Sequence, residues 1–331
     1  MDLEIIQADA RAIGLRDQSV QMCVTSPPYY GLRDYGISGQ IGLEKTLQEY
    51  IENLVMVFRE VWRVMKDDGT LWLNLGDTYG NDKQIMGVPW RVAFALQADG
   101  WYLRQDIIWQ KPNPMPESIK DRCTKAHEYI FLLFKQPKYY YDYQAILEAA
   151  NYDGRKDTIY KGSQKFHQSE HGQGSQDPGR GERTRWPNQI RGFKTKDQIQ
   201  DNQHHGNDIK GYGLSGNGFK GHSGNYDAEG NLLSHSIDGI PARNKRSVWT
   251  VPAKPYSGAH FATFPPDLII DCVKAGSREN DMVLDPFNGS GTTGEVCARL
   301  KRNYLGLELN RKYILLSNER LKPFRIQPSL I

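Results

Sequence analysis

The chain has 331 residues, enough for one large domain or for a catalytic domain with a smaller second one. Hydrophobic residues make up 38% of it, and the formal net charge of +3 is compatible with a polyanionic partner without requiring one. No apolar run approaches the roughly 20 residues of a membrane span, and the N-terminus does not resemble a signal peptide. These features argue against a membrane protein and predict a cytoplasmic one.

The first 150 residues alternate between apolar runs of strand length and helical patterns. Thr46 is predicted to begin a helix, because Glu49 follows at capping-box spacing and apolar residues then recur with a 3.6-residue period. Asp67-Asp68-Gly69 is predicted to end that helix. We expect strands at Leu3–Ile6, Val20–Thr25, Thr70–Leu75, Ile107–Trp109 and Glu128–Phe134. Strands that alternate with helices predict an α/β fold with a largely parallel sheet.

Residues 151–246 have a different composition. They contain 16 of the 32 glycines and 6 of the 8 histidines, with 15 Lys and Arg against 11 Asp and Glu. Such a segment cannot bury enough apolar surface to form a large core of its own. One interpretation is an insertion without a role. The other is a polar surface that is mobile alone and orders on nucleic acid, which predicts preferential proteolysis there and protection by bound duplex.

Residues 247–331 return to the α/β pattern. Their predicted elements form a βαβ unit followed by a helix: a strand at Asp281–Asp285, a helix at Gly294–Arg302, a strand at Tyr304–Glu308 and a helix at Arg311–Leu321. We predict that both ends of the chain build one Rossmann-like mixed sheet, from which 151–246 projects.

The first motif with chemical content is Thr-Ser-Pro-Pro-Tyr-Tyr at 25–30, directly after a predicted strand. Two prolines hold the chain in a stiff turn at a strand end, where α/β proteins place their ligands. Ser26 Oγ and the Pro27 carbonyl can accept hydrogen bonds from an amino group, and Tyr29 can stack on a planar ring. An ordinary Pro-Pro turn with a packed tyrosine is the alternative.

The second motif is Asp-Pro-Phe-Asn-Gly-Ser-Gly-Thr-Thr-Gly at 285–294. A strand, a glycine-rich loop and a helix are typical of a nucleotide-cofactor site, where Gly289 and Gly291 let a ligand approach the backbone. The loop lacks the Gly-Lys-Ser/Thr ending of a P-loop and the GxGxxG dinucleotide fingerprint. Glu308 ends the next predicted strand, which is where such folds place a carboxylate on ribose hydroxyls.

Together these motifs resemble those of the amino-group DNA methyltransferases of bacteria and phages, in the circularly permuted subclass called β. In that family the catalytic turn comes first, a target-recognition region follows, and the Phe-x-Gly-x-Gly cofactor loop comes last. This chain has the same order over roughly 230 residues, with Ser26, Pro27, Pro28 and Tyr29 in the turn. The resemblance implies a catalytic half at 1–150, a target-recognition region at 151–246 and a cofactor half at 247–331.

The resemblance also implies S-adenosyl-L-methionine as the cofactor and double-stranded DNA as the partner. A cognate restriction endonuclease is a further partner that it allows, in a prokaryotic or phage-encoded setting. His260 and Phe261 are expected near the methionine end of the cofactor, and Asp9 matches an acidic position before the catalytic strand. The expected cofactor-binding residues are Asp9, His260, Phe261, Asp285, Phe287, Gly289, Ser290, Gly291, Thr292 and Glu308.

The mechanism implied by the family is direct transfer to a flipped base, which needs no covalent intermediate and therefore no catalytic cysteine. Cys23 is interpreted as core packing and His204-His205 as a solvated pair, and we predict no metal site. Trp109–Pro116, with three prolines that rule out regular structure, is either the other wall of the base pocket or a rigid connector.

Three alternatives remain open from the sequence. In the family, Ser-Pro-Pro-Tyr turns are commoner among N4-cytosine enzymes and Asp- or Asn-Pro-Pro-Tyr turns among N6-adenine enzymes. Ser26 therefore favours cytosine N4, with adenine N6 as the alternative. An RNA or protein amide methyltransferase is more distant, because those enzymes usually have the unpermuted order. A non-catalytic DNA-binding protein is disfavoured, since a decayed copy need not keep both motifs.

Overall fold

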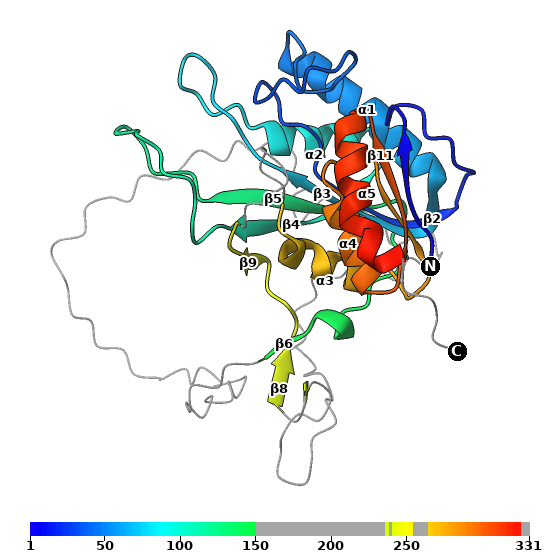
Figure 1. The fold of residues 1–331 in the computed structure, drawn as a ribbon. Helices are drawn as coiled ribbons and strands as arrows, with labels where there is room; N and C mark the ends of the chain where they lie inside the picture. The colour runs from blue at the N-terminus through cyan, green and yellow to red at the C-terminus, as the bar shows by residue number, and fades with distance from the viewer. Residues whose placement is uncertain (150–235, 238–239, 254–263, 326–331) are drawn as a thin grey trace, which may run out of the picture. The chain divides into compact units, whose positions relative to one another are not determined.

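The structure of the chain is a computed structural model that describes residues 1–149, 236–237, 240–253 and 264–325 (Figure 1). The chain separates into one compact unit, formed by Met1–Ala150 and His235–Ile331, and a second unit, Asn151–Ser234. The second unit lies outside the described residues, so its predicted ordering on DNA stays a prediction. His260 and Phe261 also lie outside them.

The first unit is built on an eight-stranded mixed sheet that joins the two ends of the chain. Val283 and Leu284 of β10 pair in parallel with Met22 and Cys23 of β2, so the strands drawn in blue and orange meet inside one sheet (Figure 1). The strand order is β1-β11-β10-β2-β3-β5-β4-β9, with β5 antiparallel to both of its neighbours. The strands are β1 (Leu3–Gln7), β2 (Val20–Thr25), β3 (Met65–Leu75), β4 (Tyr102–Gln110), β5 (His127–Phe134), β9 (Val248–Thr250), β10 (Met282–Asp285) and β11 (Asn303–Glu308).

Helices cover both faces of this sheet and bury two hydrophobic cores. One core holds α1 and α2 against the sheet through side chains such as Phe58 and Val92. The other holds α3, α4 and α5 through side chains such as Leu268, Val296 and Leu321. This three-layer arrangement confirms the predicted Rossmann-like α/β fold. The helices are α1 (Leu47–Val64), α2 (Val88–Ala98), α3 (Pro266–Gly276), α4 (Thr292–Arg299) and α5 (Arg311–Arg325), with a 3₁₀ turn at Gln144–Ile146.

Helix α1 begins as predicted and ends earlier. Thr46 and Glu49 form the complete capping box, but the helix stops at Val64 and β3 starts at once. The pairing register of β3 with β2 shifts across residues 66–69, so Asp67-Asp68-Gly69 lies within an irregular part of the strand. A Cβ on Gly69 would lie 2.7 Å from the Gln21 carbonyl oxygen, so this close passage of two strands requires glycine.

A separate small sheet of β6 (Glu148–Ala149), β8 (Ile240–Arg243) and β7 (Ser236–Ile237) lies where the chain leaves and re-enters the described part. Glu148 pairs with Arg243 in antiparallel register, and Arg243 Nε donates to Glu148 Oε1 at 2.8 Å. The two ends of the intervening segment are therefore held side by side. Among the helices that the structure describes, none has the length and apolarity to cross a membrane.

The order of the main sheet reverses between β10 and β2. From β10 the chain passes through α4 to β11 on one side, and from β2 it passes through α1 to β3 on the other. The loops after β10 and β2 therefore diverge at the carboxyl ends of adjacent parallel strands. Open α/β sheets bind their ligands in the crevice at such a point. The two sequence motifs are these two loops.

Candidate active site

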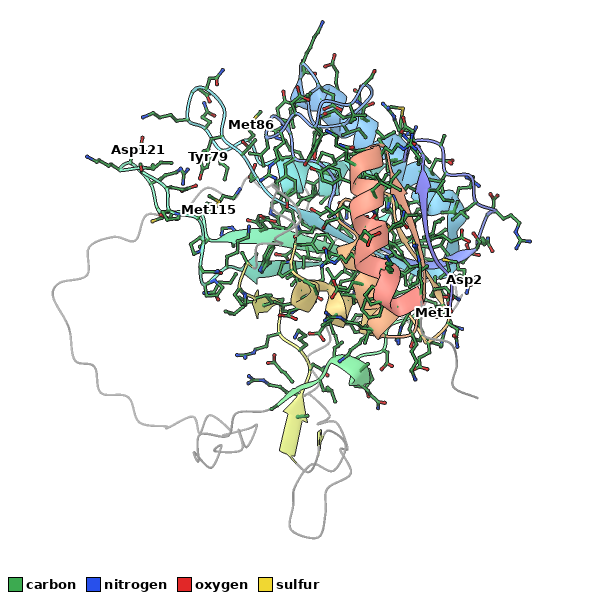
Figure 2. The ribbon with its side chains drawn as sticks, in the orientation of Figure 1. Met1, Asp2, Tyr79, Met86, Met115 and Asp121 are labelled. Atoms are coloured by element: carbon green, nitrogen blue, oxygen red, sulfur yellow. The ribbon has the colours of Figure 1, made fainter. Side chains whose placement is uncertain are left out.

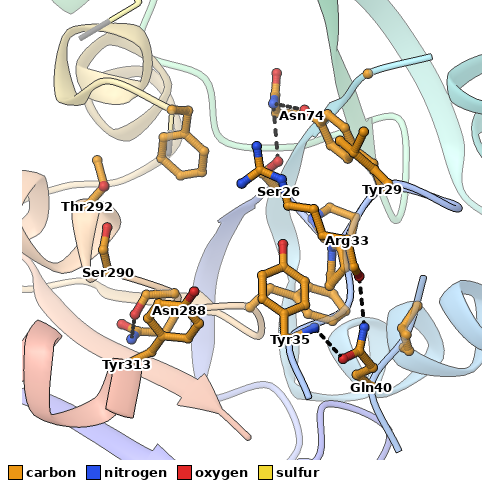
Figure 3. A pocket seen from close by; sticks show the side chains of 18 of the residues that line it. Ser26, Tyr29, Arg33, Tyr35, Gln40, Asn74, Asn288, Ser290, Thr292 and Tyr313 are labelled. Atoms are coloured by element: carbon orange, nitrogen blue, oxygen red, sulfur yellow. Dashed lines mark hydrogen bonds between the residues drawn. The ribbon is translucent and has the colours of Figure 1, made fainter. Parts of the chain in front are cut away.

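A cavity of about 500 Å³ opens at this reversal point, within the usual size range of ligand pockets (Figure 3). Its walls come from the loops after β1, β2, β3, β10 and β11 and from the adjoining ends of β4 and β5. Both motifs contribute to it. Of the predicted site residues, ten line the cavity: Asp9, Ser26, Pro27, Pro28, Tyr29, Phe287, Gly289, Ser290, Thr292 and Glu308.

The catalytic turn predicted from the sequence is held in place on two sides. The hydroxyl of Tyr50, a buried residue of helix α1, donates to the Pro28 carbonyl oxygen at 2.8 Å. On the other side, the Tyr29 ring rests against Gly76, where a Cβ would lie only 2.5 Å from Tyr29 Cε2. Gly76 is therefore required by this close approach, and it fixes the plane of the aromatic ring.

A hydrogen-bond network surrounds the polar atoms of the turn. Asn74, at the carboxyl end of β3 and 4% exposed, donates through Nδ2 to Ser26 Oγ at 3.2 Å and to the Tyr29 hydroxyl at 2.9 Å (Figure 3). The same nitrogen lies 3.1 Å from Glu128 Oε2, to which the Tyr29 hydroxyl donates at 2.5 Å. Burial, and next the negative charge of Glu128, raise the pKa of Tyr29, so its phenol stays protonated.

Lys111 completes this network from the end of β4. Its ammonium pairs with Glu128 Oε1 and lies 4.3 Å from the centroid of the Trp109 ring. Four residues of the stretch Trp109–Pro116 line the cavity: Trp109, Lys111, Pro114 and Met115. Strand β4 runs to Gln110, so the irregular part of this stretch is shorter than predicted and begins just before the first proline.

Two loops extend the rim of the cavity beyond the sheet. Figure 2 labels Tyr79 and Met86 in the loop after β3, and Met115 and Asp121 in the loop between β4 and β5. Contacts link the two loops: the Arg122 guanidinium lies 4.2 Å from the centroid of the Tyr79 ring, and the Lys125 ammonium donates to the Asp77 carbonyl oxygen. Met115, with 84% of its surface exposed, stands at this rim.

At the opposite end of the cavity, Glu308 is fixed by backbone groups. Gly289 N–H donates to Glu308 Oε2 and Asn310 N–H donates to Oε1, each at 2.8 Å. Burial raises the pKa of Glu308, and the two backbone hydrogen bonds oppose that rise. Gly289 has φ +52°, and a Cβ there would have one described atom within 4 Å, the Phe287 carbonyl oxygen at 3.8 Å. The loop backbone therefore faces open space beside a carboxylate.

Asp285 does not line the cavity. Its buried carboxylate accepts from the Thr25 and Thr293 hydroxyls at 2.6 Å each and from the Phe287 N–H at 3.0 Å. Burial raises the pKa of Asp285 to about 6. The carboxylate thus joins the strand before the catalytic turn to the helix after the glycine-rich loop. Its direct contact with a cofactor stays a prediction.

Gly291 likewise serves packing in the structure. Its φ of +79° lies in the left-handed region, and a Cβ there would lie 2.7 Å from Cβ of Ser317 in α5. The space beside Gly291 is therefore filled by the protein itself, which differs from the predicted close approach of a ligand. Ser290 and Thr292, next to it, both accept hydrogen bonds from the Arg320 guanidinium, which holds their loop against α5.

Aromatic side chains that sequence reasoning missed also line the cavity near the glycine-rich loop. Tyr35 and Tyr313 meet edge to face with ring centroids 6.2 Å apart, and both point into the space shown in Figure 3. Asp9 lies on the same side and forms an ion pair with Arg11 at 2.6 Å, and its hydrogen bond with Arg11 lowers the pKa of Asp9. Tyr35 and Tyr313 carry no local motif, because each depends on the fold to reach the cavity.

The residues present fit S-adenosylmethionine. Glu308, at the end of the strand that follows the glycine-rich loop, is placed to accept hydrogen bonds from ribose hydroxyls. Phe287, Tyr35 and Tyr313 provide flat apolar surface for a purine, and Gly289 leaves the backbone open. Within the described ranges, no group of three or more His, Cys, Asp or Glu side chains could hold a metal ion.

The fold is a Rossmann-like sheet, and a Ser-Pro-Pro-Tyr turn and a glycine-rich loop meet where the strand order of this sheet reverses. These features define a class of methyltransferases that bind a nucleotide cofactor. The model of the DNA methylase family matches residues 20–319, and the chain belongs to this family. It is 39% identical over 332 residues to the type II methyltransferase M.XycI from Xanthomonas campestris pv. cyanopsidis, covering 92% of this chain and 82% of that protein. It is 38% identical to the type II methyltransferase M.SmaI from Serratia marcescens, covering 96% and 90%.

Solved structures agree on the fold. A putative DNA modification methylase from Thermus thermophilus, complexed with S-adenosyl-L-methionine, superposes with a TM-score of 0.54 at 20% identity, covering 97% of this chain and 93% of that one. The PvuII DNA methyltransferase, described as cytosine-N4-specific, superposes with a TM-score of 0.58 at 16% identity, covering 99% and 87%. The chain is an S-adenosylmethionine-dependent DNA methyltransferase of the N4/N6 amino type.

Proposed function

We propose that this enzyme methylates the exocyclic amine of a base rotated out of duplex DNA, and that the base is cytosine. The observation that carries the proposal is the Ser26 hydroxyl, which lines the cavity beside Tyr29 and the proline turn. A neutral hydroxyl at this position is the feature by which the turn resembles those of N4-cytosine enzymes. Adenine N6, a conjugated amine of similar chemistry, is the alternative outcome of the test below.

The residues of the turn bind and orient the amine. Because the Pro28 carbonyl oxygen already accepts from Tyr50, the acceptors left for the amino group are Ser26 Oγ and the Pro27 carbonyl. Hydrogen bonds from the two N–H groups to these acceptors turn the nitrogen lone pair toward the cofactor side of the cavity. Tyr29, braced by Gly76, stacks on the base, and base–aromatic stacking of ~1–3 kcal/mol offsets part of the cost of unpairing.

Residues at the other end hold the cofactor, which supplies an electrophilic methyl group on a sulfonium when bound. Glu308 binds the ribose hydroxyls, and Phe287, Tyr35 and Tyr313 surround the adenine. The loop Gly289–Thr292 lies along the remainder, with Asp9 on the same side and His260 and Phe261, outside the described residues, near the methionine end. Since the methyl group is already activated, the chain contributes orientation and the exclusion of water more than acid–base power.

The domain roles follow the same division. Residues 1–150 carry the catalytic turn, 247–331 carry the cofactor loop, and 151–246 recognise the DNA sequence. Support for the last role comes from the composition of that segment and from the β6–β8 ladder, in which Glu148 pairs with Arg243. A cognate restriction endonuclease is proposed from the type II methyltransferases to which the chain is similar.

Nucleoside mass spectrometry of DNA methylated in vitro tests the choice of base. The proposal expects N4-methylcytosine with wild-type enzyme and none with Ser26→Ala, which keeps the fold but removes one acceptor. N6-methyladenine without N4-methylcytosine would show that adenine is the target. Substrate duplexes that contain only one of the two bases in the modified strand provide the matched control.

A further inference from the structure

After methyl transfer, the amine nitrogen must lose a proton. The proposed function does not say which group of the enzyme accepts that proton. The nitrogen lone pair forms a bond to the methyl carbon as the sulfur–carbon bond breaks, so the nitrogen carries one hydrogen too many. A protonated conjugated amine is a strong acid, and an ordinary carboxylate is a sufficient acceptor. Ser26, the side chain that contacts the amine in the proposed function, is a neutral hydroxyl and cannot keep the proton.

Asn74 cannot take the proton from Ser26. Its Nδ2, with two N–H donors, lies within hydrogen-bond distance of Ser26 Oγ, the Tyr29 hydroxyl and Glu128 Oε2, while its buried Oδ1 has no hydrogen-bond partner among the described residues. The opposite amide orientation would place Oδ1 at 3.1 Å from the Glu128 carboxylate, where two acceptors repel each other. The carboxylate therefore fixes Asn74 as a donor, and the Ser26 proton must leave by another route.

Tyr29 and Glu128 provide that route. The three oxygen atoms of Ser26, Tyr29 and Glu128 each lie within 3.2 Å of the single Nδ2 atom of Asn74, and the Ser26 hydroxyl opposes the rise in the pKa of Tyr29. The Tyr29 hydroxyl in turn donates to Glu128 Oε2 at 2.5 Å, a short hydrogen bond of the charge-assisted kind.

Two lysines lie near the Glu128 carboxylate. Lys111 pairs with its other oxygen, and the charge of Lys125 faces it from the loop before β5. The Glu128 side chain is 13% exposed, so water has little direct access to it. Glu128 is therefore a shielded side chain with two cationic neighbours.

We propose that Glu128 is the terminal proton acceptor of the reaction, reached from the target amine through Ser26 and Tyr29. The amine gives its proton to Ser26 Oγ, Ser26 gives its hydroxyl proton to Tyr29, and Tyr29 gives its own to Glu128 Oε2. Ser26 and Tyr29 end as they began, and Glu128 ends neutral until water removes the proton after product release. Glu128 acts through other residues and is a relay residue, and this role rests on the proposed function.

Single-turnover rates of methyl transfer, measured from pH 4.5 to 8.5, test the relay in the full-length enzyme. The wild-type rate is expected to rise with pH and then to level off, because a step that needs a carboxylate as proton acceptor is slowed in acid. Glu128→Gln should lower the plateau roughly 100-fold or more, as loss of a positioned proton acceptor does, and should abolish the rise at low pH. The affinity for S-adenosylmethionine should not change, and Glu52→Gln, an exposed change on α1, serves as the control.

Tyr29→Phe separates the relay from stacking, because it keeps the ring and removes the hydroxyl. The relay predicts that this variant is slowed about as much as Glu128→Gln, and that the double variant is no slower than either. A Tyr29→Phe variant with the wild-type rate, or a Glu128→Gln variant that is slower by the same factor at every pH, would overturn the relay alone. Wild-type enzyme that transfers no methyl to any DNA would overturn the proposed function together with it.

Discussion

Glu308 shows how a carboxylate is prepared for a ligand by the backbone around it. Its two oxygens each accept one backbone N–H, from Gly289 and Asn310, so the side chain has a single orientation at the edge of the cavity. Glu308 lines the cavity together with Gly289 and Ser290 of the glycine-rich loop. A group held in this way loses little additional entropy when it binds ribose hydroxyls.

Glu308→Gln should weaken S-adenosylmethionine binding roughly 10- to 100-fold, because it removes hydrogen bonds to a charged acceptor worth ~1.5–3 kcal/mol. Isothermal titration calorimetry with the cofactor alone measures this without DNA. Glu4→Gln, an exposed carboxylate on β1, is the matched control and should bind as wild type does. Equal affinities for all three proteins would remove Glu308 from the cofactor site.

Asp285 predicts a dependence of stability on pH. Its pKa is raised by burial to about 6 in the folded chain, against an ordinary value of 3.8. Between these values the folded state binds more protons than the unfolded state, so its contribution to stability is greatest below pH 4 and falls as pH rises through 6. Asp285→Asn removes this titration but keeps one acceptor for the two threonine hydroxyls.

The free energy of unfolding in urea, measured at pH 5 and pH 8, checks the sign. Relative to wild type, Asp285→Asn should gain roughly 1–2 kcal/mol on going from pH 5 to pH 8. A stability difference between the two proteins that stays constant, or that moves the other way, would mean that Asp285 titrates normally.

Several site residues could be predicted from the sequence because they lie in compact motifs. The turn Ser26–Tyr29 and the loop Phe287–Thr292 each follow an apolar run and contain prolines or glycines with few other uses. Asn74 was missed although it lies near the end of a predicted strand, since a single asparagine carries no motif. Glu128 was missed because β5 runs antiparallel, which brings the beginning of that strand, and not its end, to the active-site edge.

The two glycines of the loop between β10 and α4 have different structural roles. Gly289 and Gly291 both have positive φ, but among the described residues an added Cβ would meet another element only at Gly291, where it would contact the Ser317 side chain of α5. Alanine at either position costs about 1–2 kcal/mol for the left-handed backbone. At position 291 the contact with α5 adds a further cost of ~1–3 kcal/mol for overpacking.

The pair of variants should therefore separate stability from binding. Gly291→Ala should have the larger loss of unfolding free energy, and Ser317→Gly, which removes the contacting Cβ, should restore part of it. Gly289→Ala should retain more stability and lose more affinity for S-adenosylmethionine. Thermal denaturation and calorimetry on both variants measure the two effects, and the reverse order of losses would contradict these assignments.

The elements with strong periodic patterns were predicted correctly, and those shaped by tertiary contacts were not. Helix α1 has both a capping box and an unbroken apolar face, so its start is right. Its end is wrong because Asp67-Asp68-Gly69, a common helix terminator, lies instead in the irregular start of β3. Helix α2 begins at a left-handed Gly87 without a side-chain cap, and α3 begins at prolines, so neither has a local start signal that the sequence reasoning used.

For the whole molecule, the main consequence of the fold is that the two ends of the chain complete one active site. The catalytic turn and the cofactor loop lie far apart in the sequence. Thr25 and Asp285, at the start of these two motifs, are 260 residues apart, yet the Thr25 hydroxyl donates a hydrogen bond directly to the Asp285 carboxylate. The order of the two motifs in the sequence predicted that the two ends of the chain form one site. The pairing of β2 with β10, on which it depends, comes from packing over a long separation that no local pattern records.

Replacement of residues 151–234 by a short Gly-Ser linker should separate cofactor binding from sequence-specific DNA binding. Because β6 and β8 hold the flanking ends together and the remaining unit has its own two cores, cofactor affinity should stay within about threefold of wild type. Sequence-specific DNA binding should be lost, as an electrophoretic mobility assay would show. Specific binding that survives the deletion would assign recognition to the described residues.

The most direct test of the central claim is to map modified bases in DNA from a methylation-free bacterial host that expresses the protein. We expect a methylated amino group, N4 of cytosine, at every copy of one short sequence. Expression of Ser26→Ala should leave the same copies unmodified. DNA without a methylated exocyclic amine, or with 5-methylcytosine in its place, would contradict the claim that the Ser-Pro-Pro-Tyr turn positions an amine for direct transfer.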